Sequence, residues 1–247
     1  MTTAIATRDL HVSYGEQHVL CDLTFSVPHG SSVAIIGPNG SGKSTLLGAL
    51  AGTVKLAEGA VEVAGGSPAF VLQSTEVDKS LPITVRDTVT MARYPRVGLL
   101  RRLSRADHDA VSSAMERLDI SDLAHKQFHE LSGGQRQRVL VAQGLAQDAE
   151  VLLLDEPITG LDVTSYNTIL KIIDHEVEHG RTVALTTHSL EDARRCDYVL
   201  LLASRQVAFG TADEVLVEEH LRAAFGGSVV TIGNQMILDD PHHHHDH

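Results

Sequence analysis

The feature that most constrains this chain is a glycine-rich stretch between an apolar run at residues 33–36 and a helix-favouring run at residues 46–51. A buried strand, a tight turn and a helix N-terminus leave several backbone N–H groups pointing to one place, where the helix dipole also favours an anion. The spacing GxxxxGKS in this context predicts a phosphate-binding loop rather than an ordinary glycine-rich turn. The loop residues are Gly37, Pro38, Asn39, Gly40, Ser41, Gly42, Lys43, Ser44 and Thr45.

Two side chains of this loop have predicted roles toward a nucleotide. The Lys43 ammonium is placed to reach the outer phosphates, and the Ser44 hydroxyl is placed to ligate an accompanying Mg²⁺. The three glycines of the loop permit its tight backbone path. We therefore predict a nucleotide and Mg²⁺ as ligands.

Composition limits the partners of the chain. Its 247 residues, 43% of them hydrophobic, suffice for one large domain or a core with a subdomain. A net charge of -12 argues against a nucleic-acid partner, because binding to a polyanion needs clustered Lys and Arg. Cys21 and Cys196 are too few for a disulfide framework, which fits a reducing compartment. Lacking a signal peptide and an apolar run of about 18 residues, the chain is expected to be soluble and to reach a membrane only through a partner.

The hydrophobic pattern predicts an α/β fold, with a P-loop NTPase core whose mixed sheet carries helices on both faces. Apolar and polar residues alternate within residues 4–27, which predicts an N-terminal antiparallel β layer with one exposed face. Cys21, Leu23, Phe25 and Val27 form the expected buried side of that layer. Two further strands, joined by a turn, are expected at 61–63 and 70–72, and continuous apolar runs at 151–154 and 183–186 are typical of parallel strands.

An inserted helical subdomain is predicted between these strands. Thr84 with Asp87, and Ser104 with Asp107, resemble capping boxes, and apolar residues follow at helical spacing, so residues 84–145 are expected to be helical. The predicted units are a nucleotide-binding core at residues 1–80 and 146–226, a helical subdomain at residues 81–145, and a flexible tail rich in His and Asp at residues 227–247.

Three other stretches carry candidate chemistry. Asp155 and Glu156 lie at the end of a predicted buried strand, at the sheet edge where α/β folds bind ligands. We therefore predict that Asp155 holds Mg²⁺ and that Glu156 polarises the attacking water. Ser132 begins a second helix N-terminus suited to an anion, although a plain N-cap with a flexible glycine pair fits equally well. By itself, a histidine placed like His188 after a buried strand is more often a core histidine than a catalytic one. Tyr14 fits a turn aromatic that covers the core as well as it fits a ligand contact.

The combination of these motifs resembles the motif set of ATP-binding cassette (ABC) ATPases, over residues 5–225. The motifs that carry the resemblance are Tyr14, residues 37–45, Gln73, residues 131–135, residues 154–157, residues 159–162 and His188. The resemblance implies a head-to-tail dimer in which each phosphate loop binds ATP and the partner covers that nucleotide with Ser132, Gly133, Gly134 and Gln135.

The resemblance also implies individual roles. Tyr14 would stack on adenine, Gln73 would sense the γ-phosphate, join Ser44 and Asp155 around Mg²⁺ and contact a transmembrane partner, and Asp162 would cross the dimer interface. Lys43, Glu156 and His188 would form the catalytic set, with His188 on the γ-phosphate. The motor would lie at the cytoplasmic side of the membrane and work with permease subunits and a solute-binding protein.

The helical segment bears on the substrate. Residues 81–87, 91–94 and 98–102 resemble the corresponding stretches of manganese and zinc importers, which makes a divalent metal ion the expected cargo. Importers of siderophore or cobalamin chelates share part of the pattern. An exporter cassette, or a cassette acting on DNA or ribosomes, remains an alternative, although the interval between Gly37 and Leu131 leaves no room for a long coiled coil.

The C-terminal end is the last feature that the sequence offers. Four consecutive histidines at 242–245, then Asp246 and His247, follow Asp239 and Asp240. Imidazoles and carboxylates are zinc ligands, so the hypothesis is a metal-responsive tail, and the alternative is a purification tag.

Overall fold

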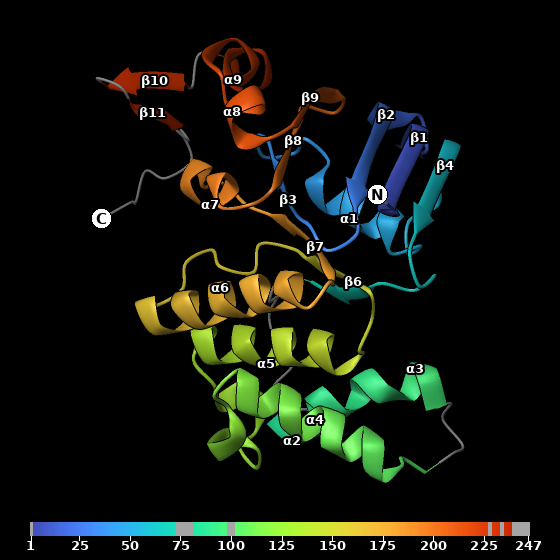
Figure 1. Cartoon of the computed structure of the whole chain (residues 1–247), viewed down its shortest axis with the longest axis vertical. Helices are drawn as coiled ribbons and strands as arrows, with labels where there is room; N and C mark the ends of the chain where they lie inside the picture. Colours follow the sequence, from blue (N-terminus) through green and yellow to red (C-terminus); the bar gives the residue numbers. More distant parts are fainter. Residues whose placement is uncertain (1, 73–81, 98–101, 227–228, 233–234, 239–247) are drawn as a thin grey trace.

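The structure, a computed structural model, describes residues 2–72, 82–97, 102–226, 229–232 and 235–238. Figure 1 shows two lobes: the sheets and the first helix lie in one, and a group of helices makes up the other. The helices α5 (Gly133–Ala146) and α6 (Val163–Glu178) lie side by side where the lobes meet. The nucleotide-binding core and the inserted helical subdomain predicted from sequence correspond to these two lobes.

The larger sheet has six strands. In spatial order they are β5 (Ala69–Val71), β6 (Val151–Leu154), β7 (Thr182–Thr186), β3 (Ser32–Ile36), β8 (Tyr198–Leu202) and β9 (Gln206–Gly210). The first five pair in parallel, and β9 runs antiparallel to β8. Every residue of β3, β6 and β7 is buried, which confirms the parallel strands inferred from their continuous apolar runs.

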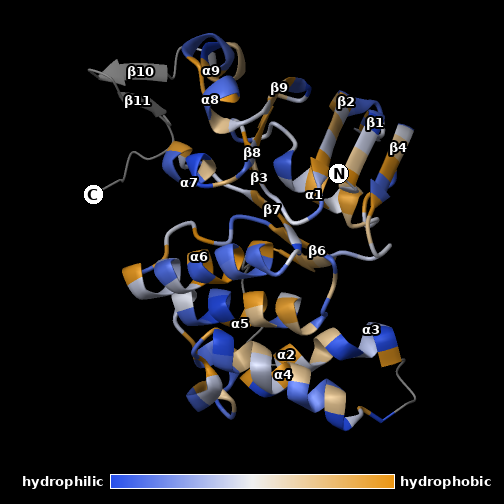
Figure 2. Cartoon of the chain, in the orientation of Figure 1, coloured by the Kyte–Doolittle hydropathy of each residue, from blue (hydrophilic) through white to orange (hydrophobic). Residues whose placement is uncertain are grey.

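Both faces of this sheet are covered. Val33 and Ile35 of β3 pack into a core with the antiparallel layer and α1 (Lys43–Leu50), whereas Ala34 and Ile36 pack into a second core. The second core also takes side chains from α7 (Leu190–Arg194), α8 (Ala212–Val215) and α9 (Glu218–Phe225). Figure 2 shows apolar residues along the strands and mixed polar and apolar residues along α4 and α6. β3, which leads into the loop at residues 37–45, is therefore packed against apolar side chains on both sides.

The second sheet is the predicted antiparallel layer. Its order is β2 (Gln17–Pro28), β1 (Thr3–Tyr14) and β4 (Glu58–Val63). The predicted alternation holds at Leu23, Phe25 and Val27, which are buried, but Cys21 is only half-buried. At this position Asp22 has φ 54, and the N–H of Cys21 donates to the carbonyl of the distant Ser204 at 2.8 Å, so the pattern shifts by one residue and Leu20 is buried instead.

The strands expected at residues 61–63 and 70–72 exist as parts of β4 and β5, but they belong to different sheets. β4 pairs with β1, whereas β5 forms the edge of the six-stranded sheet next to β6. The intervening segment therefore connects two layers. It does not form a hairpin.

The helical subdomain contains α2 (Val85–Thr90), α3 (Tyr94–Val97), α4 (Arg105–Arg117) and α5, with 3₁₀ turns at Met91–Arg93, Ser121–Leu123 and Phe128–Glu130. Both predicted capping boxes are present. The Thr84 hydroxyl accepts from the Asp87 N–H, the Ser104 hydroxyl accepts from the Asp107 N–H, and both carboxylates reach back to the cap residue. Between α4 and α5 the chain makes short turns, so helix is not continuous over the predicted span of residues 84–145.

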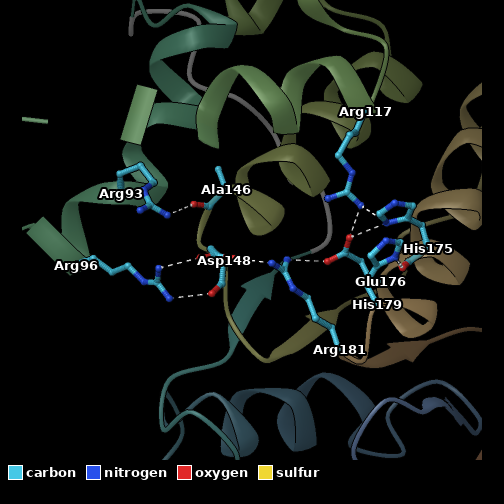
Figure 3. Close-up of polar contacts among 9 residues, drawn as sticks. All are labelled: Arg93, Arg96, Arg117, Ala146, Asp148, His175, Glu176, His179 and Arg181. Atoms are coloured by element: carbon cyan, nitrogen blue, oxygen red, sulfur yellow. Dashed lines mark hydrogen bonds and ion pairs between the residues drawn. The ribbon is translucent and has the colours of Figure 1, made fainter. Parts of the chain in front are cut away.

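Charged side chains join the two lobes (Figure 3). Arg96 of α3 donates to the Asp148 carboxylate at 3.2 Å and to the Asp148 carbonyl at 2.8 Å. Arg181 pairs with Asp148 and, at 2.8 Å, with Glu176 of α6. Arg117 of α4 contacts the other oxygen of Glu176. We call these five residues the interlobe ion network, because Arg96 and Arg117 come from the helical subdomain and Glu176 and Arg181 come from the core.

Glu176 is the buried centre of the interlobe ion network, with a side chain only 2% exposed. Burial by itself would raise the pKa of Glu176, but the hydrogen bonds and charges of Arg117 and Arg181 outweigh burial and hold the pKa below its usual value. The carboxylate is therefore charged at neutral pH and depends on both arginines.

The C-terminal segment contains a hairpin of β10 (Val229–Ile232) and β11 (Gln235–Leu238), paired antiparallel. The predicted tail from residue 227 therefore includes these two short strands, whose sequences are rich in β-branched and apolar residues, and its flexibility stays a prediction. The His-rich end at 239–247 lies outside the described residues. Within the described ranges, we find no helix with both the length and the apolar character that crossing a membrane requires.

Candidate active site

The phosphate-binding loop connects the end of β3 to the start of α1, as the sequence predicts. Gly42 is the N-cap of α1 with φ 96, and a Cβ there would lie 2.4 Å from Leu20 Cδ2. A Cβ on Gly37 would lie 2.0 Å from the Leu202 carbonyl oxygen. Both glycines are thus required by close packing of the loop against β2 and the end of β8.

The polar groups of the loop surround the N-terminus of α1. Lys43 is buried, and its Nζ donates to the carbonyls of Gly37 at 2.9 Å and Pro38 at 3.1 Å. The Ser41 hydroxyl is buried with no hydrogen-bond partner among the described residues, whereas Ser44 is exposed. An orphaned hydroxyl, an ammonium and a helix N-terminus together suit a phosphate group, because each supplies a donor or positive charge.

Asp155 and Glu156 follow β6 directly, at the edge of the sheet where β3 also ends. The Asp155 N–H donates to the Val71 carbonyl at 2.9 Å, and its Oδ1 accepts from the Thr186 hydroxyl at 2.7 Å. Glu156 has φ 47, and its N–H donates to the same Thr186 hydroxyl at 2.8 Å. The backbone of the acidic pair is therefore held by β5 and β7 on its two sides, and Thr186 also holds the Asp155 carboxylate.

His188 lies beside Glu156, with its Nε2 at 2.7 Å from Glu156 Oε1. This hydrogen bond is the main reason why the pKa of Glu156 lies below its usual value; burial opposes the shift, and the charges of His188 and Lys43 add to it. The phosphate-binding loop and the acidic pair lie at the same edge of the sheet, because β3 and β6, which lead into them, are both parallel neighbours of β7. Glu156 is consequently ionised at neutral pH.

The loop that carries His188 has its own supports. The Thr187 hydroxyl accepts from the Ser189 N–H at 3.1 Å, and the Ser189 hydroxyl caps α7 by accepting from the Asp192 N–H at 3.1 Å. The Tyr166 hydroxyl donates to Asp192 at 2.5 Å. These contacts, and the role of Thr186, were missed in the sequence. The only local signal was the pair of threonines that directly precedes His188.

The second predicted anion site is the start of α5. Ser132 caps the helix in a capping box with Gln135, and Ser132 and Gly133 are exposed. A Cβ on Gly134 would meet Asp162 Oδ2 at 2.3 Å and Ser165 Oγ at 2.5 Å, so this glycine allows α5 to pack on the start of α6. The contacts found for Gly134 thus lead to the start of α6.

Asp162 is the N-cap of α6. Its carboxylate accepts from the Ser165 N–H and hydroxyl, each at 2.9 Å, and these bonds lower its pKa. Tyr14, at the end of β1, is 55% exposed. Gln73 lies outside the described residues. The predicted contacts of Asp162 with a partner, of Tyr14 with adenine and of Gln73 with Mg²⁺ stay predictions.

A glycine-rich loop between β3 and α1, an acidic pair at the end of β6 and a histidine after β7 that binds one of the acids define a P-loop nucleotide hydrolase. Comparison narrows the class: residues 20–159 match the ABC transporter family, and the chain belongs to that family. It is an ABC ATPase, which confirms the predicted P-loop fold and ATP as ligand.

The chain is similar over almost its whole length to cassettes of known systems. It is 35% identical over 236 residues to the manganese transport system ATP-binding protein MntB of Bacillus subtilis, covering 92% of this chain and 94% of that protein. It is 36% identical over 234 residues to the zinc transport system ATP-binding protein TroB of Treponema pallidum, covering 92% and 88%. Its fold matches an inward-facing metal-chelate type ABC transporter with a TM-score of 0.83, 31% identity, and coverage of 91% and 89%.

Proposed function

We propose that this chain hydrolyses ATP to drive import of a divalent metal ion, manganese or zinc, through separate membrane permease subunits. The observation that carries the ATPase mechanism is the pair of Glu156 and His188, whose Oε1 and Nε2 atoms are 2.7 Å apart, at the same sheet edge as the phosphate-binding loop. The metal cargo is supported by the names of two similar proteins, a manganese and a zinc transport system ATP-binding protein. A peripheral position on the cytoplasmic face and a solute-binding protein in the same system belong to this proposal.

The residues of the site fit a nucleotide with Mg²⁺. Ser44 and Asp155 offer the oxygen ligands that Mg²⁺ prefers, Gln73 would be the third protein ligand, and Lys43 and the α1 N-terminus would bind the phosphates. When bound, Mg²⁺ neutralises charge on the phosphates. The ionised Glu156 orients the attacking water and accepts its proton, while His188 holds the Glu156 carboxylate and reaches the γ-phosphate.

The catalytic assignment is tested by Glu156→Gln, which keeps the shape of the side chain and removes the charge that activates water. We expect kcat for ATP to fall about 10²- to 10⁴-fold, with ATP binding retained. Glu116→Gln on the exposed side of α4 is the matched control and should leave turnover unchanged. Steady-state phosphate release measures turnover, and nucleotide titration measures ATP binding. Near wild-type turnover of Glu156→Gln would remove Glu156 from the mechanism.

The cargo is tested in cells of the source organism that lack this chain and carry either wild type or Glu156→Gln. We expect the wild type alone to restore cellular manganese or zinc, measured by elemental mass spectrometry in metal-limited medium. Unchanged content of both metals would contradict the proposed cargo while leaving the ATPase assignment intact.

Import of a metal chelate is the second candidate function, because the matching solved structure is of the metal-chelate type. Supplying the metal either free or as a preformed chelate separates the two candidates. Restoration by the chelate alone would favour the chelate importer.

A further inference from the structure

Thr186 connects the two acidic residues of the site through one hydroxyl. It is the last residue of β7 and is fully buried. Its Oγ1 donates to Asp155 Oδ1 at 2.7 Å and accepts from the Glu156 N–H at 2.8 Å. A hydroxyl has one donor and two acceptor positions, so both bonds exist together.

The backbone of Glu156 needs such a support. Its φ of 47 lies in the left-handed region, which residues other than glycine adopt only where surrounding contacts hold them. Thr186 binds the N–H of that residue, and His188, two positions further along the same segment, binds its carboxylate at 2.7 Å. The end of β7 therefore fixes Glu156 at both its backbone and its side chain.

We propose that Thr186 is a positioning residue for ATP hydrolysis, which sets the Mg²⁺-side carboxylate of Asp155 and the water-orienting carboxylate of Glu156 at a fixed separation. The inference rests on the roles proposed above for these two acids. Phosphoryl transfer depends mostly on positioning and electrostatics. If the two carboxylates are loosely positioned, turnover falls even though every reacting group is present. Thr186 acts through Asp155 and Glu156 and has no contact with nucleotide in this scheme.

A purely structural role is the alternative, and β7 contains a matched control for it. Thr182, at the other end of the strand, is also fully buried, and its hydroxyl accepts from the Gly30 N–H at 3.0 Å. Thr182→Val removes a buried hydroxyl from the same strand away from the acidic pair. Thr186→Val makes the same chemical change at the pair, and Thr186→Ser keeps the hydroxyl there.

The test measures kcat, KM for ATP and the Mg²⁺ concentration for half-maximal rate in the full chain, below the melting temperature of each variant. We expect Thr186→Val to lower kcat about 10- to 100-fold and to raise the Mg²⁺ requirement, with KM for ATP within about twofold of wild type. Thr186→Ser and Thr182→Val should each stay within about threefold of wild-type kcat.

Three results would overturn the proposal: wild-type kcat and Mg²⁺ dependence in Thr186→Val, an equal loss in Thr182→Val, or an equal loss in Thr186→Ser. If Thr186→Val does not fold, Thr186→Ala takes its place, and unfolding of both assigns Thr186 to stability alone. Glu156→Gln is measured in parallel. If Glu156→Gln is inactive and Thr186→Val is fully active, only the role of Thr186 is rejected. If Glu156→Gln is active, the catalytic assignment of Glu156, on which the role of Thr186 rests, is rejected as well.

Discussion

At the scale of single residues, the site depends on backbone conformations that ordinary side chains adopt at a cost. Gly42 combines φ 96 with a close approach to Leu20, and Glu156 keeps φ 47 without the freedom of a glycine. The two cases differ in purpose. Gly42 allows the loop to close around an anion. The strained backbone of Glu156 sets the direction of its carboxylate, and the hydrogen bond from the Glu156 N–H to the Thr186 hydroxyl offsets the strain.

Gly42→Ala is expected to lower the free energy of unfolding by about 2 kcal/mol or more, because strain at positive φ adds to a contact with Leu20 that must be relieved. Gly52→Ala is the matched control, since Gly52 has φ 72 and nothing lies within 4 Å of its added Cβ. Strain alone at that position should cost about 1 kcal/mol. Urea unfolding of both variants gives the comparison, and equal losses would show that the contact with Leu20 is harmless.

At the scale of elements, the helix caps hold the subdomain. The carboxylate of Asp107 binds the Ser104 hydroxyl and N–H at the start of α4 and also pairs with Arg93, which in turn donates to the Ala146 carbonyl at the end of α5. These bonds, those to Ser104 first, lower the pKa of Asp107 from 3.8 to about 2. One cap thereby joins α4, the turn after α2 and the end of α5.

Asp107 predicts how stability changes with acid. A carboxyl whose folded pKa lies below its unfolded pKa stabilises the fold above the unfolded value and loses that effect as pH falls through the folded value. The window here runs from 3.8 down to about 2. The difference in melting temperature between wild type and Asp107→Asn should be full at pH 6 and should shrink below about pH 4. Asp109→Asn on the same helix, whose partner Arg105 is exposed, should show little difference at any pH. A gap between wild type and Asp107→Asn that does not depend on pH would contradict this mechanism.

Sequence was sufficient where the deciding forces are local. The caps at Thr84 and Ser104, the burial of Leu23, and the strand–loop–helix path of the phosphate-binding loop each depend on neighbours within a few residues, and these predictions were confirmed. The assignment of β4 and β5 to different sheets, and the contact of Thr186 with the acidic pair, depend on partners far along the chain. No local sequence pattern identifies such partners. The shift in the burial pattern at Cys21 likewise depends on the hydrogen bond from its N–H to the Ser204 carbonyl.

At the scale of the whole molecule, the interlobe ion network sets how the helical subdomain sits on the core (Figure 3). Arg117→Gln should lower the free energy of unfolding by about 2 kcal/mol, because Glu176 stays buried and, among the described residues, keeps Arg181 as its arginine partner, with the His175 imidazole at 3.5 Å. Arg8→Gln, which breaks an exposed pair with Glu62, should cost at most about 0.5 kcal/mol. Chemical denaturation measures both, and a cost for Arg117→Gln as small as that for Arg8→Gln would show that Glu176 does not need Arg117.

The assembly of two chains is the largest scale, and Ser132 is the residue that tests it. The contacts of Gly134 tie the start of α5 to α6, while Ser132 and Gly133 stay exposed and available to a second copy. In a head-to-tail dimer this end would cover the partner's γ-phosphate, so the bulk of Ser132→Arg should abolish ATP hydrolysis without weakening nucleotide binding to the monomer.

Mixing experiments make the dimer prediction specific. A heterodimer of Ser132→Arg with Lys43→Ala contains one site carrying both defects and one site with neither, because each site takes its phosphate-binding loop from one chain and its Ser132 from the other. We expect hydrolysis to reappear on mixing two inactive proteins, at no more than half the wild-type rate per dimer. Recovery of ATPase activity against mixing ratio is the measurement, with each protein alone as the control. Reduced ATP affinity of dilute Ser132→Arg monomer, or no recovery in a heterodimer verified by size, would show that the composite site is wrong.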